Sequence, residues 1–331
     1  MSHCCKYEIV NSVSVVFNLP SLAFVLILIA AGVVFWLLLV CTISWAILTP
    51  PRMTDGKALY LLNRLSPADI GLPFERCSFV TAGRPGQSIR IAGWWIPSAH
   101  PSRRTVILLH GFADAKVGAI AWARMWHELG FNILSVDLRG HGESGGRYCT
   151  GGYLERYDVA NVIDDLRLQH PTETERVLLF GISFGGAVAL ATASLRDDLA
   201  GVVVDSPYAS YEAAVRQHLR LSRLFDRTTF RPALLLAERF AGADFNAVHP
   251  TQLIPLISAP ILLIQSDADA VIPPVSRRLL LTAMRDDTLH VRQSLAIDGA
   301  PHVKGFHTDP SRYCAAIKSF VDALPNGNEA V

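Results

Sequence analysis

An uncharged, almost wholly apolar stretch near the N-terminus constrains the organisation of this chain more than any other feature. No Asp, Glu, Lys or Arg occurs between Glu8 and Arg52, and Leu22–Leu48 is nearly all apolar. A hydrocarbon layer about 30 Å thick is crossed by about 20 helical residues, so this run is long enough to span it. We therefore predict that residues 1–51 form a tail and a single transmembrane anchor.

Two other N-terminal signals fit the apolar run less well. A cleaved secretory signal has a basic start, an apolar core of about 7–15 residues and a small-residue cleavage site, whereas only Lys6 precedes this much longer run. A lipoprotein signal needs small residues before its cysteine, but bulky residues 38–40 precede Cys41. Cys4 and Cys5 are close enough to the anchor to be acylated, although an incidental thiol pair is the preferred interpretation.

The charges that flank the run predict how it crosses the membrane. Lys6 stands on one side, against Arg52, Lys57 and Arg64 on the other. By the positive-inside rule, the C-terminal bulk of the protein is expected on the cytoplasmic side of a single-pass membrane protein.

Composition excludes several functions. Lys and Arg total 30 and Asp and Glu total 29, and a net charge of +1 offers no footprint for nucleic acid. The six cysteines include no C-x-x-C pair, and the chain has neither H-E-x-x-H nor a P-loop lysine. We expect no cofactor and no metal, and the oligomeric state stays open.

Beyond the anchor, the sequence pattern predicts a linker and one large domain. Residues 52–78 are polar and punctuated by proline, which indicates a linker with a short helix. From 79 to 324, short Val/Ile/Leu runs alternate with amphipathic stretches, as in a parallel sheet covered by helices on both faces; residues 325–331 are a tail. The expected strands are 91–97, 105–110, 131–137, 177–183, 201–205, 261–266 and 290–297, and the expected helices are 114–129, 153–169, 184–195, 275–284 and 309–323.

One motif carries chemistry. Gly181-Ile182-Ser183-Phe184-Gly185 follows the predicted strand 177–183 and precedes a good helix former. In that setting G-x-S-x-G is a nucleophile elbow, in which a serine sits on a tight turn and the glycines let strand and helix approach. An ordinary helix N-cap is the alternative role for this serine.

With these motifs the sequence resembles the α/β-hydrolase superfamily of serine hydrolases, from about Phe79 to Leu324. Three further segments are similar to motifs of that superfamily: Leu108–Phe112, Asp137–Ser144 and Asp267–Pro273. The resemblance implies an α/β-hydrolase fold, a mostly parallel doubly wound sheet with a small helical cap.

The resemblance also implies a catalytic triad. Ser183 is the expected nucleophile, Asp269 the acid and His302 the base, in the chain order of this fold. Asp269 lies four residues before a proline, as the family's acid does, and Asp267 is the runner-up. His302 follows the last predicted strand and is preferred to His307.

Other residues of these motifs are expected to support the site. The backbone N–H groups of Phe112 and Phe184, which follow the His-Gly pair and the nucleophile, are the expected oxyanion hole. His110 is expected to support the oxyanion loop rather than to exchange protons in the reaction. His141 and Arg139 are expected to have structural roles in the glycine-rich turn that follows the next strand.

Residues 206–251 interrupt the alternation where this fold often carries a cap. The apolar residues there can line an acyl pocket or lie at a membrane surface, and the alternative is a solvated helical pair packed on its own core. The segment contains Arg216, Arg220, Arg223, Arg227 and Arg231 and the apolar residues Leu221, Leu224, Phe225, Leu234, Leu235 and Leu236.

Three functions remain. The first is a membrane-anchored serine hydrolase that cleaves carboxylic esters or thioesters of a small-molecule or lipid-like substrate. The second is a serine peptidase or amidase of the same fold. The third, from a different class, is a catalytically silent hydrolase fold that serves as a membrane binding module; the intact Ser, Asp and His argue against it.

Overall fold

An eight-stranded sheet forms the centre of this computed structural model, which describes residues 19–82, 88–219 and 225–325. The strand order is β1-β2-β4-β3-β5-β6-β7-β8. β2 runs antiparallel to both of its neighbours, and every later pair is parallel. The strands are β1 (Glu75–Ala82), β2 (Ser88–Ile96), β3 (Arg104–Leu109), β4 (Asn132–Val136), β5 (Arg176–Ile182), β6 (Gly201–Asp205), β7 (Ile261–Ser266) and β8 (Arg292–Ile297).

The inner strands have the burial that their sequences predict. Every residue of β4, β6 and β7 is buried, as expected for strands covered on both faces. Because β3, β5, β6 and β7 are parallel, their carboxyl ends meet at one edge of the sheet, where Ile182 of β5 pairs with Asp205 of β6. The predicted doubly wound α/β architecture is confirmed.

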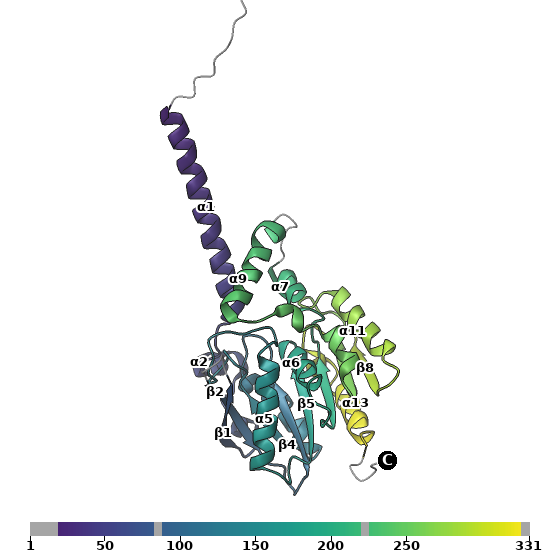
Figure 1. The fold of residues 1–331 in the computed structure, drawn as a ribbon. Helices are drawn as coiled ribbons and strands as arrows, with labels where there is room; N and C mark the ends of the chain where they lie inside the picture. The colour runs from purple at the N-terminus through teal and green to yellow at the C-terminus, as the bar shows by residue number, and fades with distance from the viewer. Residues whose placement is uncertain (1–18, 83–87, 220–224, 326–331) are drawn as a thin grey trace, which may run out of the picture.

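Helices cover both faces of this sheet (Figure 1). One apolar core packs α5, α6 and α11 against the sheet, and a second packs α4 and α13 against the opposite face. The helices and turns after the anchor are α2 (Asp55–Leu62), η1 (Pro67–Ile70), α3 (Lys116–Ala119), η2 (Ile120–Trp122), α4 (Ala123–Glu128), α5 (Glu155–Gln169), α6 (Phe184–Ala193), α7 (Tyr211–Leu219), η3 (Asp226–Phe230), α9 (Arg231–Ala241), η4 (Phe245–Ala247), α10 (Pro250–Leu253), η5 (Ile254–Leu256), α11 (Pro274–Asp286), α12 (Gly305–Thr308) and α13 (Pro310–Asp322).

The segment that we predicted as a linker, residues 52–78, packs on the domain. Ala58 of α2 and Leu72 belong to the core that also contains α4 and α13. The sheet begins inside this segment, because β1 starts at Glu75 and pairs with β2. Its sequence is polar because β1 is the edge strand and α2 lies on the surface, so few of its side chains are fully covered.

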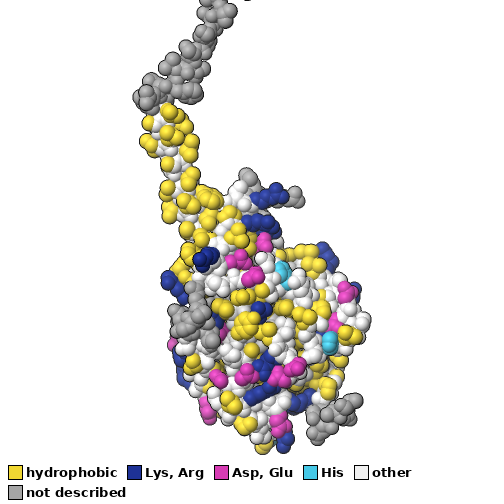
Figure 2. All heavy atoms as spheres, viewed as in Figure 1, with side chains coloured by type: hydrophobic (Ala, Val, Ile, Leu, Met, Phe, Trp, Pro, Cys, Tyr) yellow, Lys and Arg dark blue, Asp and Glu magenta, His cyan; other side chains and the backbone are white. Residues whose placement is uncertain are grey.

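The N-terminal helix α1 (Leu19–Leu48) protrudes from the domain as one long rod (Figures 1 and 2). Every side chain from Leu22 to Leu38 is exposed, and apolar groups cover this part of the rod. By length and composition Leu22–Leu48 is a candidate membrane span. Its last turns behave differently: Val40, Ser44 and Leu48 are buried against the domain.

The cap consists of α7, η3 and α9, which lie beside the base of α1 (Figure 1). Phe230 and Leu234 of the cap are buried in the same core as Ile47 and Leu48 of α1. The cap is therefore packed on α1 rather than only on itself. Some residues of the predictions lie outside the described part of the chain: Cys4, Cys5, Lys6, Arg220, Leu221, Arg223 and Leu224, with most of the tail 325–331.

Candidate active site

Ser183 occupies a strained turn between β5 and α6. Its backbone has φ 50° and ψ −115°, a conformation that L-residues rarely adopt. A Cβ atom on Gly181 would lie 2.2 Å from the carbonyl oxygen of Gly185, and one on Gly185 would lie 2.2 Å from that of Leu109. Only hydrogen fits at both positions, so the two glycines let the strand, the turn and the helix come together. The turn holds Ser183 at the carboxyl edge of the sheet.

His302 and Asp269 meet this serine from two later loops. The Nε2 atom of His302 lies 2.9 Å from Ser183 Oγ. On the other side of the ring, Nδ1 lies 2.6 Å from Asp269 Oδ2. The His302 side chain is 18% exposed and that of Asp269 1%, so the histidine is accessible and its partner is not. The hydroxyl, imidazole and carboxylate thus form one hydrogen-bonded line.

The carboxylate of Asp269 is held in a fixed orientation. Its Oδ1 atom accepts hydrogen bonds from the backbone N–H groups of Val271 and Ile272, each at 2.8 Å, which leaves Oδ2 for His302. Since the imidazole Nδ1–H donates to Oδ2, its Nε2 lone pair faces the serine hydroxyl. This is the tautomer that a general base requires.

The structure distinguishes Asp269 and His302, which lie in line with Ser183, from the runners-up Asp267 and His307. The side chain of Asp267 is exposed, and its Oδ1 atom lies 3.6 Å from Arg277 Nη1. His307 lies on α12, with its ring against Phe306. Each runner-up therefore has a different environment from the residue that reaches Ser183.

Phe112 and Phe184 line a cavity of about 330 Å³ together with Ser183. Phe184 is the first residue of α6, so its N–H has no acceptor within the helix and is free for a ligand. Phe112 lies in the turn after β3, in ring contact with Phe184 at 6.3 Å between centroids. Both expected oxyanion-hole residues thus line the same cavity as Ser183.

His110 and His141 are buried next to residues that line this cavity. The backbone N–H of Leu138 donates to His110 Nε2 at 2.9 Å, and His110 Nδ1 lies 2.7 Å from the Gly111 carbonyl, which fixes a neutral tautomer. Burial lowers the pKa of His110 to about 4 and that of His141 to about 3. Both rings are therefore neutral at physiological pH, and His141 stacks against Phe184.

Two buried ion pairs support the loops of the site. Arg139 is paired with the buried carboxylate of Asp158. Lys116 Nζ lies 2.6 Å from Asp137 Oδ2 and 2.6 Å from Glu143 Oε2, which ties the loop after β3 to the glycine-rich turn after β4. Arg139 thus has the bracing role expected of it, and Lys116 adds a second brace that the motifs did not indicate.

Asp205 is a buried acid beside the site that sequence reasoning did not select. It ends β6, and its backbone carbonyl accepts from Ser183 N–H at 2.8 Å. Its carboxylate accepts hydrogen bonds from Tyr313 Oη at 2.9 Å and from Ser206 Oγ at 2.8 Å. Burial raises the pKa of Asp205 to about 6. An Asp at the end of a buried strand is the signal that could have found it.

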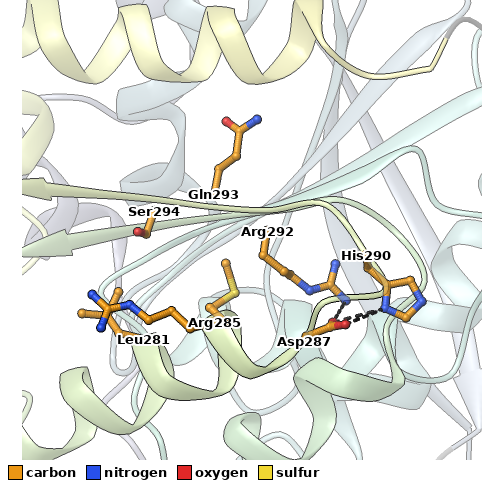
Figure 3. Close-up of a pocket in the computed structure, with 8 residues that line it drawn as sticks. Leu281, Arg285, Asp287, His290, Arg292, Gln293 and Ser294 are labelled. Atoms are coloured by element: carbon orange, nitrogen blue, oxygen red, sulfur yellow. Dashed lines mark hydrogen bonds and ion pairs between the residues drawn. The ribbon is translucent and has the colours of Figure 1, made fainter.

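A second hollow, of about 250 Å³, lies beside β8 and also contains an Asp and a His (Figure 3). His290 and Arg292 converge on Asp287, whereas Ser294 lies apart from them. Burial alone would raise the pKa of Asp287, but its hydrogen bond to His290 and the charge of Arg292 lower it. Because Asp287 is neutralised by an arginine and no hydroxyl bonds His290 among the described residues, this hollow lacks the arrangement found at Ser183.

Sheet, elbow and loops together have the architecture of an α/β-hydrolase. A family model described as serine aminopeptidase, S33, matches residues 100–241, which include Phe112 and the turn at Ser183. The chain therefore has the α/β-hydrolase fold, and part of it matches a hydrolase family.

Three known proteins illustrate its relationships. The uncharacterized protein YqkD of Bacillus subtilis is 26% identical over 265 residues, which cover 77% of this chain and 82% of that protein. The structure of the Pyrococcus furiosus esterase Pf2001 superposes with a TM-score of 0.67 at 21% identity, over 85% of this chain and 99% of that one. A Pyrococcus horikoshii acylaminoacyl peptidase superposes with a TM-score of 0.57 at 16% identity, over 84% of this chain and 45% of that one. At these identities the two structures show a shared fold.

Proposed function

We propose that this protein is a membrane-anchored serine hydrolase that cleaves carboxylic ester or thioester bonds through an acyl-enzyme on Ser183. One observation carries the proposal: Ser183 Oγ lies 2.9 Å from His302 Nε2, whose ring is held by Asp269, at the edge of an apolar cavity. A neutral serine is a weak nucleophile, and this geometry supplies the base that activates it.

In the first half-reaction, His302 Nε2 takes the hydroxyl proton while Ser183 Oγ attacks the ester carbonyl carbon. Asp269 stabilises the imidazolium without taking the proton itself. The carbonyl oxygen becomes an oxyanion and is met by the N–H groups of Phe112 and Phe184, donors of a kind that contribute about 10²–10³ in rate each. His302 then gives its proton to the leaving alcohol or thiol, which departs and leaves the acyl group on Ser183.

In the second half-reaction, water replaces the alcohol. His302 removes a proton from the water as its oxygen attacks the acyl-enzyme, and then returns that proton to Ser183 Oγ. The products are the free acid and the alcohol or thiol, and the enzyme is regenerated. Besides the ester or thioester, water is the only reactant consumed.

The lining of the cavity favours an ester over a peptide. Burial of the charged amino end of a free peptide is unfavourable without an acidic partner, and the described residues that line this cavity include no charged one. The peptidase alternative keeps a basis in the family match and in the fold shared with the acylaminoacyl peptidase. We therefore rank it second.

We also propose that the exposed part of α1 anchors the protein in a membrane, with the hydrolase domain on the cytoplasmic side. Uninterrupted apolar exposure from Leu22 to Leu38 would be unfavourable in water but suits lipid. Protease treatment of sealed inside-out and right-side-out vesicles tests the orientation, since only a cytoplasmic domain is digested selectively in inside-out vesicles.

The activity is tested with the full chain in detergent or vesicles, on p-nitrophenyl esters and on peptide anilides. We expect ester turnover that is lost in Ser183→Ala and in His302→Ala. Faster cleavage of the anilides would favour the peptidase. Folded wild-type protein without turnover of either substrate would favour the binding module.

A further inference from the structure

The base of the anchor helix forms part of the cavity that contains Ser183. Ile43, Ala46 and Ile47 of α1 line one side of this cavity. Facing residues come from the cap and from the loops at the carboxyl edge of the sheet, namely Tyr208, Tyr211, Ala214, Val215, Val271 and Ile272. A helix that the sequence marks only as an anchor thus borders the reacting hydroxyl.

Hydrogen bonds attach this end of α1 firmly to the domain. Tyr211 Oη donates to the carbonyl oxygen of Ile47 at 3.2 Å, and the backbone N–H of Cys149 donates to that of Leu48 at 2.8 Å. One turn earlier, the hydroxyl of Ser44 lies 2.8 Å from the Ala233 carbonyl in the cap. The last carbonyl groups of a helix have no partners within it. Here the domain supplies them, so the helix is a fixed wall of the cavity.

The length of free helix places the cavity close to a membrane surface. Trp36 Nε1 donates to the Thr228 carbonyl at 2.8 Å, so the cap reaches α1 at this residue. Leu19–Phe35 then leaves about 17 residues free, a rise of about 26 Å against a hydrocarbon core of about 30 Å. Ile43 and Ile47 follow Trp36 by about 11 and 17 Å along the helix axis.

The exposed side chains of the cap are also consistent with a position at the membrane surface. Basic side chains lie toward the end of the cap that stands partway up the protruding helix (Figure 2). Arg227, Arg231 and Leu235 are exposed there. Basic and apolar groups together are typical of a surface that meets lipid headgroups.

From these contacts we propose that the base of α1 is a wall of the acyl-binding site, and that the substrate is an ester or thioester of a bilayer-resident lipid whose acyl chain lies against Ile43, Ala46 and Ile47. The inference rests on the proposed hydrolase function and names its substrate class. Most residues of α1 between the exposed span and the cavity wall are apolar, with Thr42 the exposed exception, so an acyl chain has a largely apolar route from the bilayer to Ser183. Attack on its carbonyl releases the alcohol or thiol into the aqueous phase, and water releases the fatty acid.

The test compares acyl-chain lengths in the full-length protein reconstituted in phosphatidylcholine vesicles. Ala46→Trp places a large side chain at the cavity wall, and Ala46→Leu does so to a smaller degree. Cys41→Trp is the matched control, because Cys41 is exposed at the same end of α1 and does not line the cavity. The substrates are p-nitrophenyl butyrate and p-nitrophenyl palmitate, and labelling of Ser183 by a short-chain fluorophosphonate reports that each variant is folded.

We expect Ala46→Trp to lower the palmitate-to-butyrate ratio of kcat/KM by about tenfold or more, Ala46→Leu to lower it less, and Cys41→Trp to leave it unchanged. An unchanged ratio in both Ala46 variants, with Ser183 still labelled, overturns this inference and leaves the hydrolase function standing. Absence of Ser183-dependent labelling and turnover in the wild type overturns the function itself.

A second arm tests the route of the substrate. A long-chain ester is placed either in the same vesicles as the protein or in separate vesicles. We expect faster hydrolysis when the two share a bilayer. Equal rates would show that the substrate reaches the cavity from water and would contradict the bilayer route.

Discussion

His302 Nε2 lies 2.9 Å from Ser183 Oγ, although 119 residues separate them in the chain. The fold brings them together because Ser183 follows β5 and His302 follows β8, and the loops that follow parallel strands meet at one edge of the sheet. Asp269 completes the line from the loop after β7. The predictions below follow from this arrangement and from the groups that hold it in place.

Asp269→Asn tests the acid. Asparagine keeps the size of the side chain but can no longer hold the Nδ1–H tautomer of His302, so we expect kcat to fall by about 10³–10⁴ with little change in KM. The control is Asp267→Asn, whose side chain pairs with Arg277 at the surface and not with the histidine. Steady-state ester hydrolysis measures both. Equal losses in the two variants would contradict the assignment.

Gly185→Ala tests the elbow. The new Cβ would lie 2.2 Å from the Leu109 carbonyl oxygen, so strand and helix must separate, and we expect a loss of about 3 kcal/mol or more of folding free energy. Gly56→Ala in α2 is the matched control, because its Cβ meets nothing within 4 Å. There we expect no loss and a gain of up to about 1 kcal/mol. Thermal unfolding in detergent compares them, and a tolerated Gly185→Ala would refute the packing argument.

Asp205→Asn tests the buried acid through the pH dependence of stability. Because burial raises the folded-state pKa to about 6, above the unfolded value of 3.8, the native state binds the proton more tightly. Asp205 therefore makes stability fall as pH rises from about 4 to about 6, by about 3 kcal/mol at most. Asparagine still accepts hydrogen bonds but does not titrate. Denaturant unfolding from pH 4 to 7 should show a smaller fall in the variant, and parallel curves would contradict the account.

Removal of α1 tests its attachment to the domain. A chain that begins at Arg52 lacks Val40, Ile47 and Leu48, whose burial contributes about 1.5–3 kcal/mol each. It also leaves the Tyr211 hydroxyl and the Cys149 N–H without their acceptors. We expect this fragment to unfold at lower temperature than one that begins at Trp36, which keeps the packed turns.

Calorimetry or circular dichroism of the two fragments decides this point. Equal unfolding temperatures would mean that the base of α1 contributes nothing to the folded domain. A lower unfolding temperature for the shorter fragment would confirm the role of the packed turns.

Much of the fold was predictable because its strands have simple sequence signals. Continuous Val/Ile/Leu runs indicate strands covered on both faces, and the elbow motif follows one of them. The elbow motif indicated Ser183, the resemblance to the superfamily implied Asp269 and His302, and the structure brings all three together.

Two features had no comparable signal. Lipid-facing and protein-facing turns of an apolar helix look alike, so the packed end of α1 was not distinguished from its exposed span. The run contains two hydroxyl residues near this end, Thr42 and Ser44, and Ser44 bonds the cap. Asp205 was missed because its partner Tyr313 returns from a distant helix. Such contacts depend on tertiary packing, which local sequence patterns do not record.

The most direct test of the central claim is to identify the residue that reacts with a fluorophosphonate, by mass spectrometry of the labelled full-length protein. We predict one adduct, on Ser183, which is absent in Ser183→Ala and forms far more slowly in His302→Ala. An unreactive Ser183 in folded wild-type protein, or an adduct that persists in Ser183→Ala, would contradict the account.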